Sequence, residues 1–385
     1  MMKSIKCIFL LLLMAVSFGL HAQESQFIKV SSWESLLSKA KKEGKLVLID
    51  SYFIGCIPCK EMDDEVFPLE NVKVFMEKNF VNAKINFMTE ELGKQLQIKY
   101  GVTGFPTFLI LNGDGQLISR FLGYKDADQF LKLLSEAMDK SANGLVLAGF
   151  SPELNVLYPD FYTEMFKARK SMNPIEVAAY MDKNKEVMKE GHALPFLLTK
   201  HINPYWNSYF LENYAQWEQA FGKELIAIKR NVVIKEGMKA IGTSRDDARF
   251  ASFLKEVQPK IVLKDWPNVK LNAAEHYYLN LHKDAKAFFQ FALENANDDE
   301  NKLVYLSSHL NGPKVDAEEK RLFCEWMKQV VSAGSGYEML TIATRLMLAQ
   351  NDLEQAKRYA KWGLNKSVLL QKDGSYFQGV LALKK

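Results

Sequence analysis

The sequence has few cysteines, no block of like charge and no long apolar run outside its N-terminus. Four cysteines among 385 residues are too few, and too unevenly spaced, for a framework of structural disulfides. Lys and Arg together number 50 and Asp and Glu 46, so the charge pattern does not favour nucleic acid as a partner. No glycine-rich phosphate loop of the Walker or dinucleotide type occurs, so no nucleotide cofactor is implied.

The cysteines and histidines also fail to form a metal-binding pattern. Cys56 and Cys59 lie three residues apart, with no second pair near them and no histidine between residues 23 and 140. A zinc site would need further ligands at short spacing. His276 and His282 are six residues apart, which does not align them on one face of a helix. The sequence therefore predicts no metal and no other cofactor.

The N-terminus has the composition of a secretory signal. Lys3 and Lys6 precede an apolar run over residues 7–20, and the small Ala22 offers a cleavage position. The run of about 14 residues falls short of the roughly 20 that a helix needs to cross a bilayer. We therefore expect residues 1–22 to be a signal peptide, so that the chain meets a membrane only during export. A membrane anchor is the alternative.

The rest of the chain exceeds the usual size of one hydrophobic core, and its first part, residues 23–140, alternates short apolar runs with helical periodicity. Leu46–Ile49 is too short for a helix and suits a strand buried on both faces of a sheet. Asn112-Gly113 marks a hairpin between two further strands. This order predicts an α/β domain with a mixed central sheet and helices on both sides. We expect helices near residues 33–42, 62–66, 72–79, 89–100 and 126–138, and strands near 46–49, 81–87, 107–111 and 116–122.

Beyond the first domain, strand-like runs become scarce and helical periodicity takes over. We expect a linker at residues 141–150 and an α-helical domain at residues 151–385. Ala285 and Ala356 lie 71 residues apart, close to two periods of the tetratricopeptide repeat of about 34 residues. The pattern predicts such repeats within residues 268–366, with an irregular helical bundle as the alternative.

The motif Cys56-Ile57-Pro58-Cys59 directly follows the expected buried strand. Disulfide exchange needs one thiolate that attacks and a second thiol close enough to release the mixed disulfide. Unpaired N–H groups at a helix start favour negative charge on the first sulfur, so we expect Cys56 to attack and Cys59 to be its partner one turn later. Pro58 is tolerated early in a helix because its missing N–H would have had no partner there.

Phe105 and Pro106 lie at the mouth of a strand, after Gly104 and before Thr107. A proline at this place suggests a cis peptide bond, which exposes the backbone of Phe105 to pair with an extended substrate segment. We therefore expect Phe105, Pro106 and Thr107 to bind substrate. An ordinary trans-proline loop is the alternative.

Asp50 and Lys84 are ionisable residues within apolar strands. Burial should raise the pKa of Asp50, and a carboxylate near the sulfurs could move a proton to or from Cys59. Lys84 could be the counter-charge of Asp50. Alternatively, Asp50 is a solvated carboxylate at a strand end and Lys84 lies on an exposed strand face.

These residues resemble the thioredoxin superfamily in kind and in order along the chain. The stretch from Trp33 to Phe67 is similar to the periplasmic thiol-reducing domain of the transmembrane disulfide reductases. The resemblance covers about residues 25–140. The features that carry it are Asp50, the Cys-x-Pro-Cys motif followed by Lys60, the strand with Lys84, and Gly104-Phe105-Pro106-Thr107.

The resemblance implies a thioredoxin fold with Cys56 as the nucleophile, Cys59 as the resolving thiol and a cis Pro106. It also implies that Asp50 assists proton transfer. Two departures limit what the resemblance implies, and the first of them concerns the surface that meets partners. Gly55 stands where thioredoxins usually have Trp, and Ile57 replaces the usual Gly within the motif.

As a whole, the sequence predicts an exported, periplasmic thiol-disulfide oxidoreductase that reduces protein disulfides through a Cys56/Cys59 dithiol. Proline before Cys59 resembles the reducing branch of the superfamily. The expected partners are protein substrates with disulfides or thiols, and an upstream protein that donates electrons. Two alternatives stay open: a protein-binding or chaperone-like module with the thioredoxin fold as its platform, and a disulfide oxidase or isomerase. Cys324, alone among apolar neighbours, is expected to be buried and inert.

Overall fold

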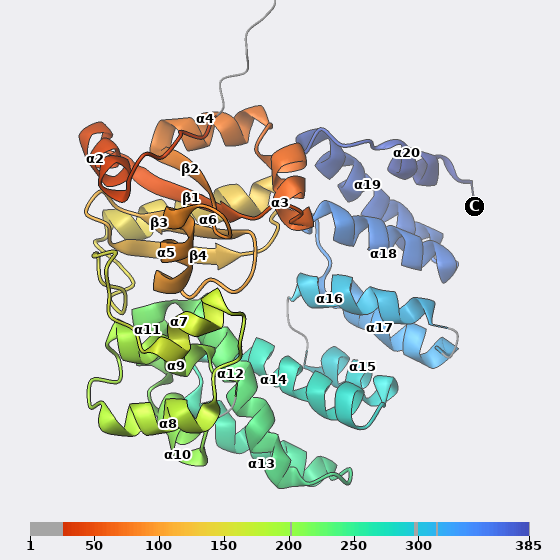
Figure 1. The fold of residues 1–385 in the computed structure, drawn as a ribbon. Helices are drawn as coiled ribbons and strands as arrows, with labels where there is room; N and C mark the ends of the chain where they lie inside the picture. The colour runs from red at the N-terminus through yellow and green to blue at the C-terminus, as the bar shows by residue number, and fades with distance from the viewer. Residues whose placement is uncertain (1–25, 201, 296–298, 313–314, 385) are drawn as a thin grey trace, which may run out of the picture.

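The structure is a computed structural model that describes residues 26–200, 202–295, 299–312 and 315–384. The predicted signal peptide lies outside the described residues. A part built around a β-sheet, here called the sheet domain (residues 33–142), lies at the upper left of Figure 1. The helical region (residues 160–382) leaves it below, curves through the lower part of the view and returns to it at the right. The helices therefore form an arc whose two ends border the sheet domain.

Four strands form the sheet in the order β2-β1-β3-β4. β1 runs parallel to β2 and antiparallel to β3, and β3 pairs antiparallel with β4. The predicted α/β fold with a mixed central sheet is confirmed, and each predicted strand is present close to its expected bounds. These bounds are β1 Leu46–Tyr52, β2 Phe80–Asn86, β3 Thr107–Leu111 and β4 Leu117–Leu122.

Helices cover both faces of the sheet, and the first of them begins and ends where the sequence predicts. The N–H of Ser35 donates to the side chain of Ser32 at the start of this helix, and Gly44 ends it with φ 64°. That left-handed conformation costs glycine little because glycine has no Cβ. The helical segments are α2 Trp33–Glu43, α3 Ile57–Glu61, the π-helical η2 Met62–Val66, α4 Glu70–Asn79, α5 Glu91–Lys99 and α6 Ala127–Ala142.

The two faces of the sheet pack into two hydrophobic clusters. Val47 and Ile49 of β1 belong to the cluster that continues into the helical region, whereas Leu48 belongs to the cluster with η2, α4 and α6. This division follows the alternation of side chains along a strand. All three side chains are fully buried, so β1 is a fixed central strand and its C-terminal end is a rigid starting point for the segment that follows.

After β4 the described residues form helices and connecting loops but no strand, as the sequence predicts. None of the described helices is both long and apolar enough to cross a membrane. The α-helices are α7 Asp160–Lys167, α8 Pro174–Lys183, α9 Glu190–Leu198, α10 Pro204–Glu212, α11 Tyr214–Phe221, α12 Lys223–Met238, α13 Asp247–Val257, α14 Trp266–Ala274, α15 Ala285–Glu294, α16 Glu300–Ser307, α17 Ala317–Val330, α18 Tyr337–Ala349, α19 Leu353–Leu369 and α20 Ser375–Ala382. Shorter 3-10 or π segments are η3 Lys239–Ile241, η4 Gln258–Lys260, η5 Leu263–Asp265, η6 Glu275–Leu281 and η7 Ser308–Asn311.

Ala285 and Ala356, on which the repeat prediction rests, lie in α15 and α19. α14 passes into the π-helical η6, and α15 begins again at Ala285 after the cap Asp284. α15 packs on α17, and α18 packs on α19. The tetratricopeptide interpretation and the domain boundaries at residues 141 and 151 stay predictions.

Polar and apolar contacts fasten the helical region to the sheet domain at both ends of the arc. At the near end, Lys99 of α5 lies 3.1 Å from Glu190 of α9, and both side chains are buried. At the far end, Lys366 of α19 pairs with Asp128 of α6, and Leu370 packs into the second cluster of the sheet domain. The helices therefore frame the sheet domain from two sides (Figure 1).

Candidate redox site

Cys56 and Cys59 are joined by a disulfide at the C-terminal end of β1. A turn through Gly55, whose φ is 93°, leads from the strand to Cys56, which is the N-cap of α3. The Cα atoms are 5.3 Å apart, and the N–H of Cys59 lies 3.2 Å from Sγ of Cys56 and donates to it. That same N–H can stabilise a thiolate on Cys56. Pro58 occupies the first turn of α3, as expected.

The surroundings of Cys56 are apolar and partly open. Cys56 is 6% exposed and Cys59 3%, so both sulfurs lie just below the surface. Ile54 and Ile57, in contrast, are 82% and 72% exposed. Exposed aliphatic side chains on both sides of the nucleophile, with glycine between them, form a low apolar rim that suits contact with a protein surface.

Asp50 is buried within β1, six residues before Cys56. Its side chain is fully inaccessible to solvent, and burial raises its pKa from 3.8 to about 7. Lys84 opposes this shift: its Nζ lies 3.1 Å from Oδ2 of Asp50, an ion-pair distance without the alignment of a hydrogen bond. The two residues are register partners in the parallel pairing of β1 with β2. Asp50 is thus buried with Lys84 as its counter-charge rather than solvated at a strand end, and Lys84 is largely covered rather than on an exposed face. The catalytic roles expected of the two residues stay predictions.

Lys84 has a second carboxylate partner that the sequence reasoning missed. Asp63 of η2 accepts a hydrogen bond from Nζ of Lys84, and the ammonium also lies 5.2 Å from the centre of the Tyr52 ring. Burial works to lower the pKa of Lys84, but Asp50 and Asp63 outweigh it and the pKa is raised. Asp63 follows Cys59 by four residues, which puts both on one helix face, and that spacing was the available signal.

The Phe105-Pro106 peptide bond is cis, as the resemblance implies. Thr107 is anchored on both sides: its N–H donates to Oγ of Ser51 at 2.8 Å, and its hydroxyl donates to the carbonyl of Gly104 at 2.8 Å. Ser51, next to Asp50 in β1, was not predicted as a site residue. It holds the start of β3 against the end of β1 and so fixes the proline loop at the same sheet edge as the cysteines.

Phe105 has an open backbone. Neither its N–H nor its carbonyl has a hydrogen-bond partner among the described residues. Its ring packs between Phe53 at 5.3 Å and Phe87 at 6.1 Å, measured between ring centres. The loop is therefore held by its side chains while its backbone can accept another extended chain.

Cys324 is a free, buried cysteine that follows the redox site by more than 260 residues in the sequence. Cys324 belongs to α17 in the helical region and is 3% exposed. Burial raises the pKa of its thiol to about 11. Such a thiol is almost wholly protonated at neutral pH and a poor nucleophile, which agrees with the expected inert role.

Comparisons with known proteins match the sheet domain. A family model described as Thioredoxin-like domain matches residues 33–138. A protein disulfide-isomerase of Ricinus communis is 27% identical over 131 residues, covering 34% of this chain and 26% of the relative. The thiol:disulfide interchange protein DsbD of Pasteurella multocida is 29% identical over 119 residues, covering 29% of this chain and 20% of the relative. This chain thus spans only about a fifth to a quarter of these curated relatives.

Solved structures give matches of the same extent. A thioredoxin from Thermus thermophilus is 27% identical and covers 29% of this chain and 88% of its own, with a TM-score of 0.27. The DsbD C-terminal domain of Neisseria meningitidis is 25% identical and covers 29% of this chain and 99% of its own, with a TM-score of 0.26. The fold of the sheet domain, its cysteine pair and the family match agree: residues 33–138 form a thioredoxin-like domain.

Proposed function

We propose that this chain is an exported thiol-disulfide oxidoreductase that reduces disulfides of protein substrates. The observation that carries the proposal is the Cys56–Cys59 disulfide just after β1, the strand in which burial of Asp50 raises the pKa of its carboxyl group to about 7. A carboxyl group with such a pKa can both take up and release a proton near neutral pH. Relatives named protein disulfide-isomerase and thiol:disulfide interchange protein support the same reaction class.

In the first step, the thiolate of reduced Cys56 attacks one sulfur of the substrate disulfide. A bond forms between Sγ of Cys56 and that sulfur, the substrate S–S bond breaks, and the other substrate sulfur leaves as a thiolate. The N–H of Cys59, which donates to Sγ of Cys56, stabilises the attacking anion. The open backbone of Phe105 pairs with the substrate chain and aligns its disulfide.

In the second step, the thiol of Cys59 loses its proton to Asp50 and attacks Sγ of Cys56. The Cys56–Cys59 disulfide forms, and the second substrate sulfur leaves as a thiolate. Two electrons have then passed from the enzyme dithiol to the substrate. When Asp50 takes the proton it loses its charge, but Lys84 stays paired with Asp63, so no buried ammonium is left without a counter-ion.

The reduced form returns when a dithiol electron-donor protein supplies two electrons by the same exchange. The reducing direction rests on Pro58 before Cys59, which resembles the reducing branch of the superfamily. Export to the periplasm rests on the composition of residues 1–22.

The test is reduction of a protein disulfide by the purified chain and three Cys→Ser variants, with dithiothreitol as the electron source. Cys56→Ser should lower the rate by about 10³-fold or more, because the nucleophile is gone. Cys59→Ser, once reduced and freed of dithiothreitol, should accumulate a mixed disulfide with the substrate, visible on a non-reducing gel. Cys324→Ser, the matched control, should act like the natural chain. Full activity of Cys56→Ser would contradict the proposal.

A further inference from the structure

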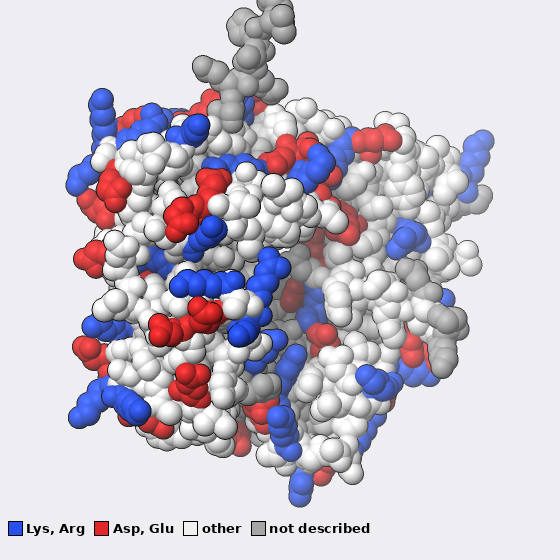
Figure 2. All heavy atoms as spheres, viewed as in Figure 1, with Lys and Arg blue, Asp and Glu red and all other residues white. Residues whose placement is uncertain are grey.

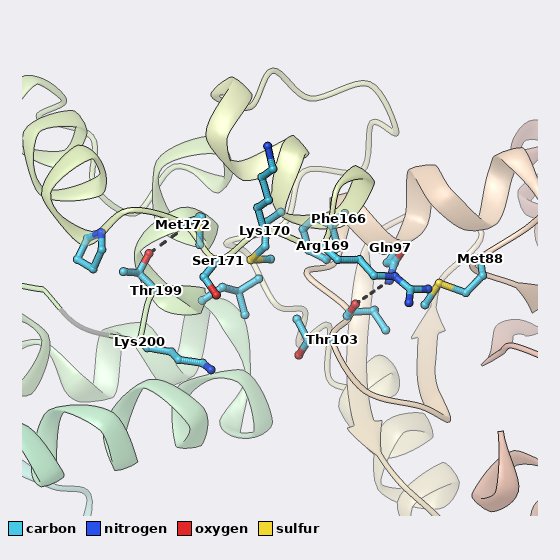
Figure 3. Close-up of a pocket in the computed structure, with 14 residues that line it drawn as sticks. Met88, Gln97, Thr103, Phe166, Arg169, Lys170, Ser171, Met172, Thr199 and Lys200 are labelled. Atoms are coloured by element: carbon cyan, nitrogen blue, oxygen red, sulfur yellow. Dashed lines mark hydrogen bonds between the residues drawn. The ribbon is translucent and has the colours of Figure 1, made fainter. Parts of the chain in front are cut away.

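A cavity of about 440 Å³ lies at the junction of the sheet domain and the helical region. Met88, Gln97 and Thr103 line it from the sheet domain, and Arg169, Lys170 and Lys200 line it from the helical region. Figure 3 shows Arg169 reaching across from the helical side toward Gln97 and Met88. The cavity exists only because the two parts of the chain come together here.

The cavity lies at the same edge of the sheet as the redox site. Met88 follows the C-terminal end of β2 by two residues, and Thr103 precedes Phe105 by two. β1 ends and β3 begins at that same edge of the sheet. The rings of Phe53, Phe105 and Phe87 form a continuous row from the segment before Cys56 to the residue before Met88. A chain bound along Phe105 therefore passes from the cysteines to the mouth of the cavity.

The charged side chains among the described residues that line the cavity are all positive. They are Arg169, Lys170 and Lys200, and none of them has an ion pair with another described residue. Figure 2 shows Lys and Arg side chains gathered along the junction between the two parts of the molecule. Cations that have no ion-pair partner in the part of the chain that the structure describes, placed around a partly apolar cavity, favour an anionic ligand with some apolar body.

The open backbone of Phe105 indicates the kind of molecule to which the anionic group belongs. Its N–H and carbonyl have no partner among the described residues, which is the arrangement that an added strand completes. Alternate side chains of such a strand face the surface of the protein. One of them can therefore enter the cavity near Thr103, which lines the cavity and precedes Phe105 by two residues. A peptide fits this combination, since its backbone meets Phe105 while an acidic side chain meets Arg169.

We propose that the cavity selects clients with an acidic residue near the reactive disulfide. This inference rests on the proposed function and names its substrate class. An extended client segment runs along Phe105, and an Asp or Glu side chain of that segment lies among Arg169, Lys170 and Lys200. The helical region thus acts as a specificity element for the thioredoxin-like domain.

The first experiment measures kcat/KM for pairs of disulfide-linked peptides that differ only in one Asp or Lys, scanned along both sides of the cysteine. At one or more positions the acidic peptide should be favoured by about tenfold at low salt, as expected for two partly exposed ion pairs. In Arg169→Glu/Lys200→Glu the preference should vanish or reverse. A preference that is absent from the natural chain, or that survives in the variant, overturns the inference.

Matched controls isolate the cavity. Lys167→Glu/Lys185→Glu makes the same change of charge at exposed lysines that do not line the cavity and should keep the preference. Reduction of the neutral hydroxyethyl disulfide should be equal in all variants, which shows an intact redox site. If Arg169→Glu/Lys200→Glu folds poorly, Arg169→Ala/Lys200→Ala serves instead and should lose most of the preference.

A binding measurement separates this inference from the proposed function. Cys56→Ser/Cys59→Ser cannot exchange disulfides, yet it should bind the acidic peptide about tenfold more tightly than the lysine peptide by fluorescence anisotropy. If the natural chain reduces no disulfide but this binding preference is present, the proposed function fails and the acidic-segment site stands. If disulfides are reduced but neither preference exists, the inference fails alone. Displacement of the acidic peptide by sulfate, but not by chloride at equal ionic strength, would make the cavity a small-anion site and overturn the client assignment.

Discussion

Two buried carboxylates, Glu190 at the junction of the two parts of the chain and Asp50 in β1, have different surroundings and therefore different roles. Glu190, at the junction with the helical region, pairs with Lys99 and accepts hydrogen bonds from Tyr158 and from the N–H of Ser151. Asp50, at the redox end of the sheet, is more deeply buried but has Lys84 as its ion-pair partner without a well-aligned hydrogen bond. Burial raises the pKa of both.

The difference lies in what each carboxylate can do when it changes charge. Protonation of Glu190 would weaken several contacts that hold two parts of the chain together. Protonation of Asp50 weakens one contact, and Lys84 keeps Asp63 as a partner. A buried carboxylate with several hydrogen-bond and ion-pair partners stabilises the fold. A buried carboxylate with few such partners can change its protonation state and so take part in proton transfer.

The largest effect that would sharpen this comparison is on stability. Lys99→Met leaves Glu190 buried without its cation and should lower the free energy of unfolding by roughly 3–5 kcal/mol. Urea denaturation at neutral pH measures it. Lys39→Met, which removes an exposed pair with Glu43, should cost less than about 0.5 kcal/mol. Equal losses of unfolding free energy in the two variants would contradict the distinction between a buried ion pair that stabilises the fold and an exposed pair that does not.

Asp50→Asn, in contrast to Lys99→Met, should make the folded chain more stable and should slow the redox reaction. The resolving step should slow by about 10²-fold, since Cys59 loses its proton acceptor. The pKa of Asp50 is about 7 in the folded chain against 3.8 as its ordinary value, so the folded state holds a proton that the unfolded state has lost between those pH values. The natural chain therefore loses stability as pH rises from about 4 to about 7.

That pH window gives the measurement. Above pH 7 the oxidised Asp50→Asn chain should be more stable than the natural chain by about 2–4 kcal/mol, and near pH 4 the difference should vanish. Thermal unfolding followed across this range separates the two curves. A variant that is equally stable at both pH values would show that Asp50 does not bear the burial cost assigned to it.

The smallest expected effect is on the pH profile of the resolving step. Asp63 raises the pKa of Asp50 through its charge, and it shares Lys84. Asp63→Asn removes that repulsion and leaves Lys84 to Asp50 alone, so the pKa of Asp50 should fall. The midpoint of the rate profile should move to lower pH. Asp64→Asn, one residue later and paired with Lys60, should leave the midpoint unchanged, and an equal shift in both variants would argue against the Lys84 bridge.

The sequence predicts the central strand, the cysteine pair and a buried Asp50 because their signals are local, whereas the contact of Asp50 with Lys84 depends on the register of β1 with β2. Leu46–Ile49 is a continuous apolar run, and the carboxylate that directly follows it is a candidate for burial, with solvation at the strand end as the alternative. The turn glycine and the capping serine of α2 lie next to the elements that they bound. These features depend on neighbours within a few residues, which one sequence contains.

What the sequence could not give depends on contacts between distant segments. Arg169 reaches Met88 only because α7 packs on α5, and Lys366 pairs with Asp128 across 238 residues. Nothing in the local pattern around these residues distinguishes them from solvated surface charges. Ser51 was missed for the same reason, since its role appears only when β3 lies beside β1.

The reduction potential of the Cys56/Cys59 couple tests the central claim most directly. The purified chain is equilibrated with dithiothreitol or glutathione buffers, and its thiols are counted at each ratio. A potential near the roughly −270 mV of thioredoxin is the result expected of a reductant. A value near about −120 mV would make the chain an oxidant and contradict the reducing direction, and a pair that never cycles would contradict the redox function itself.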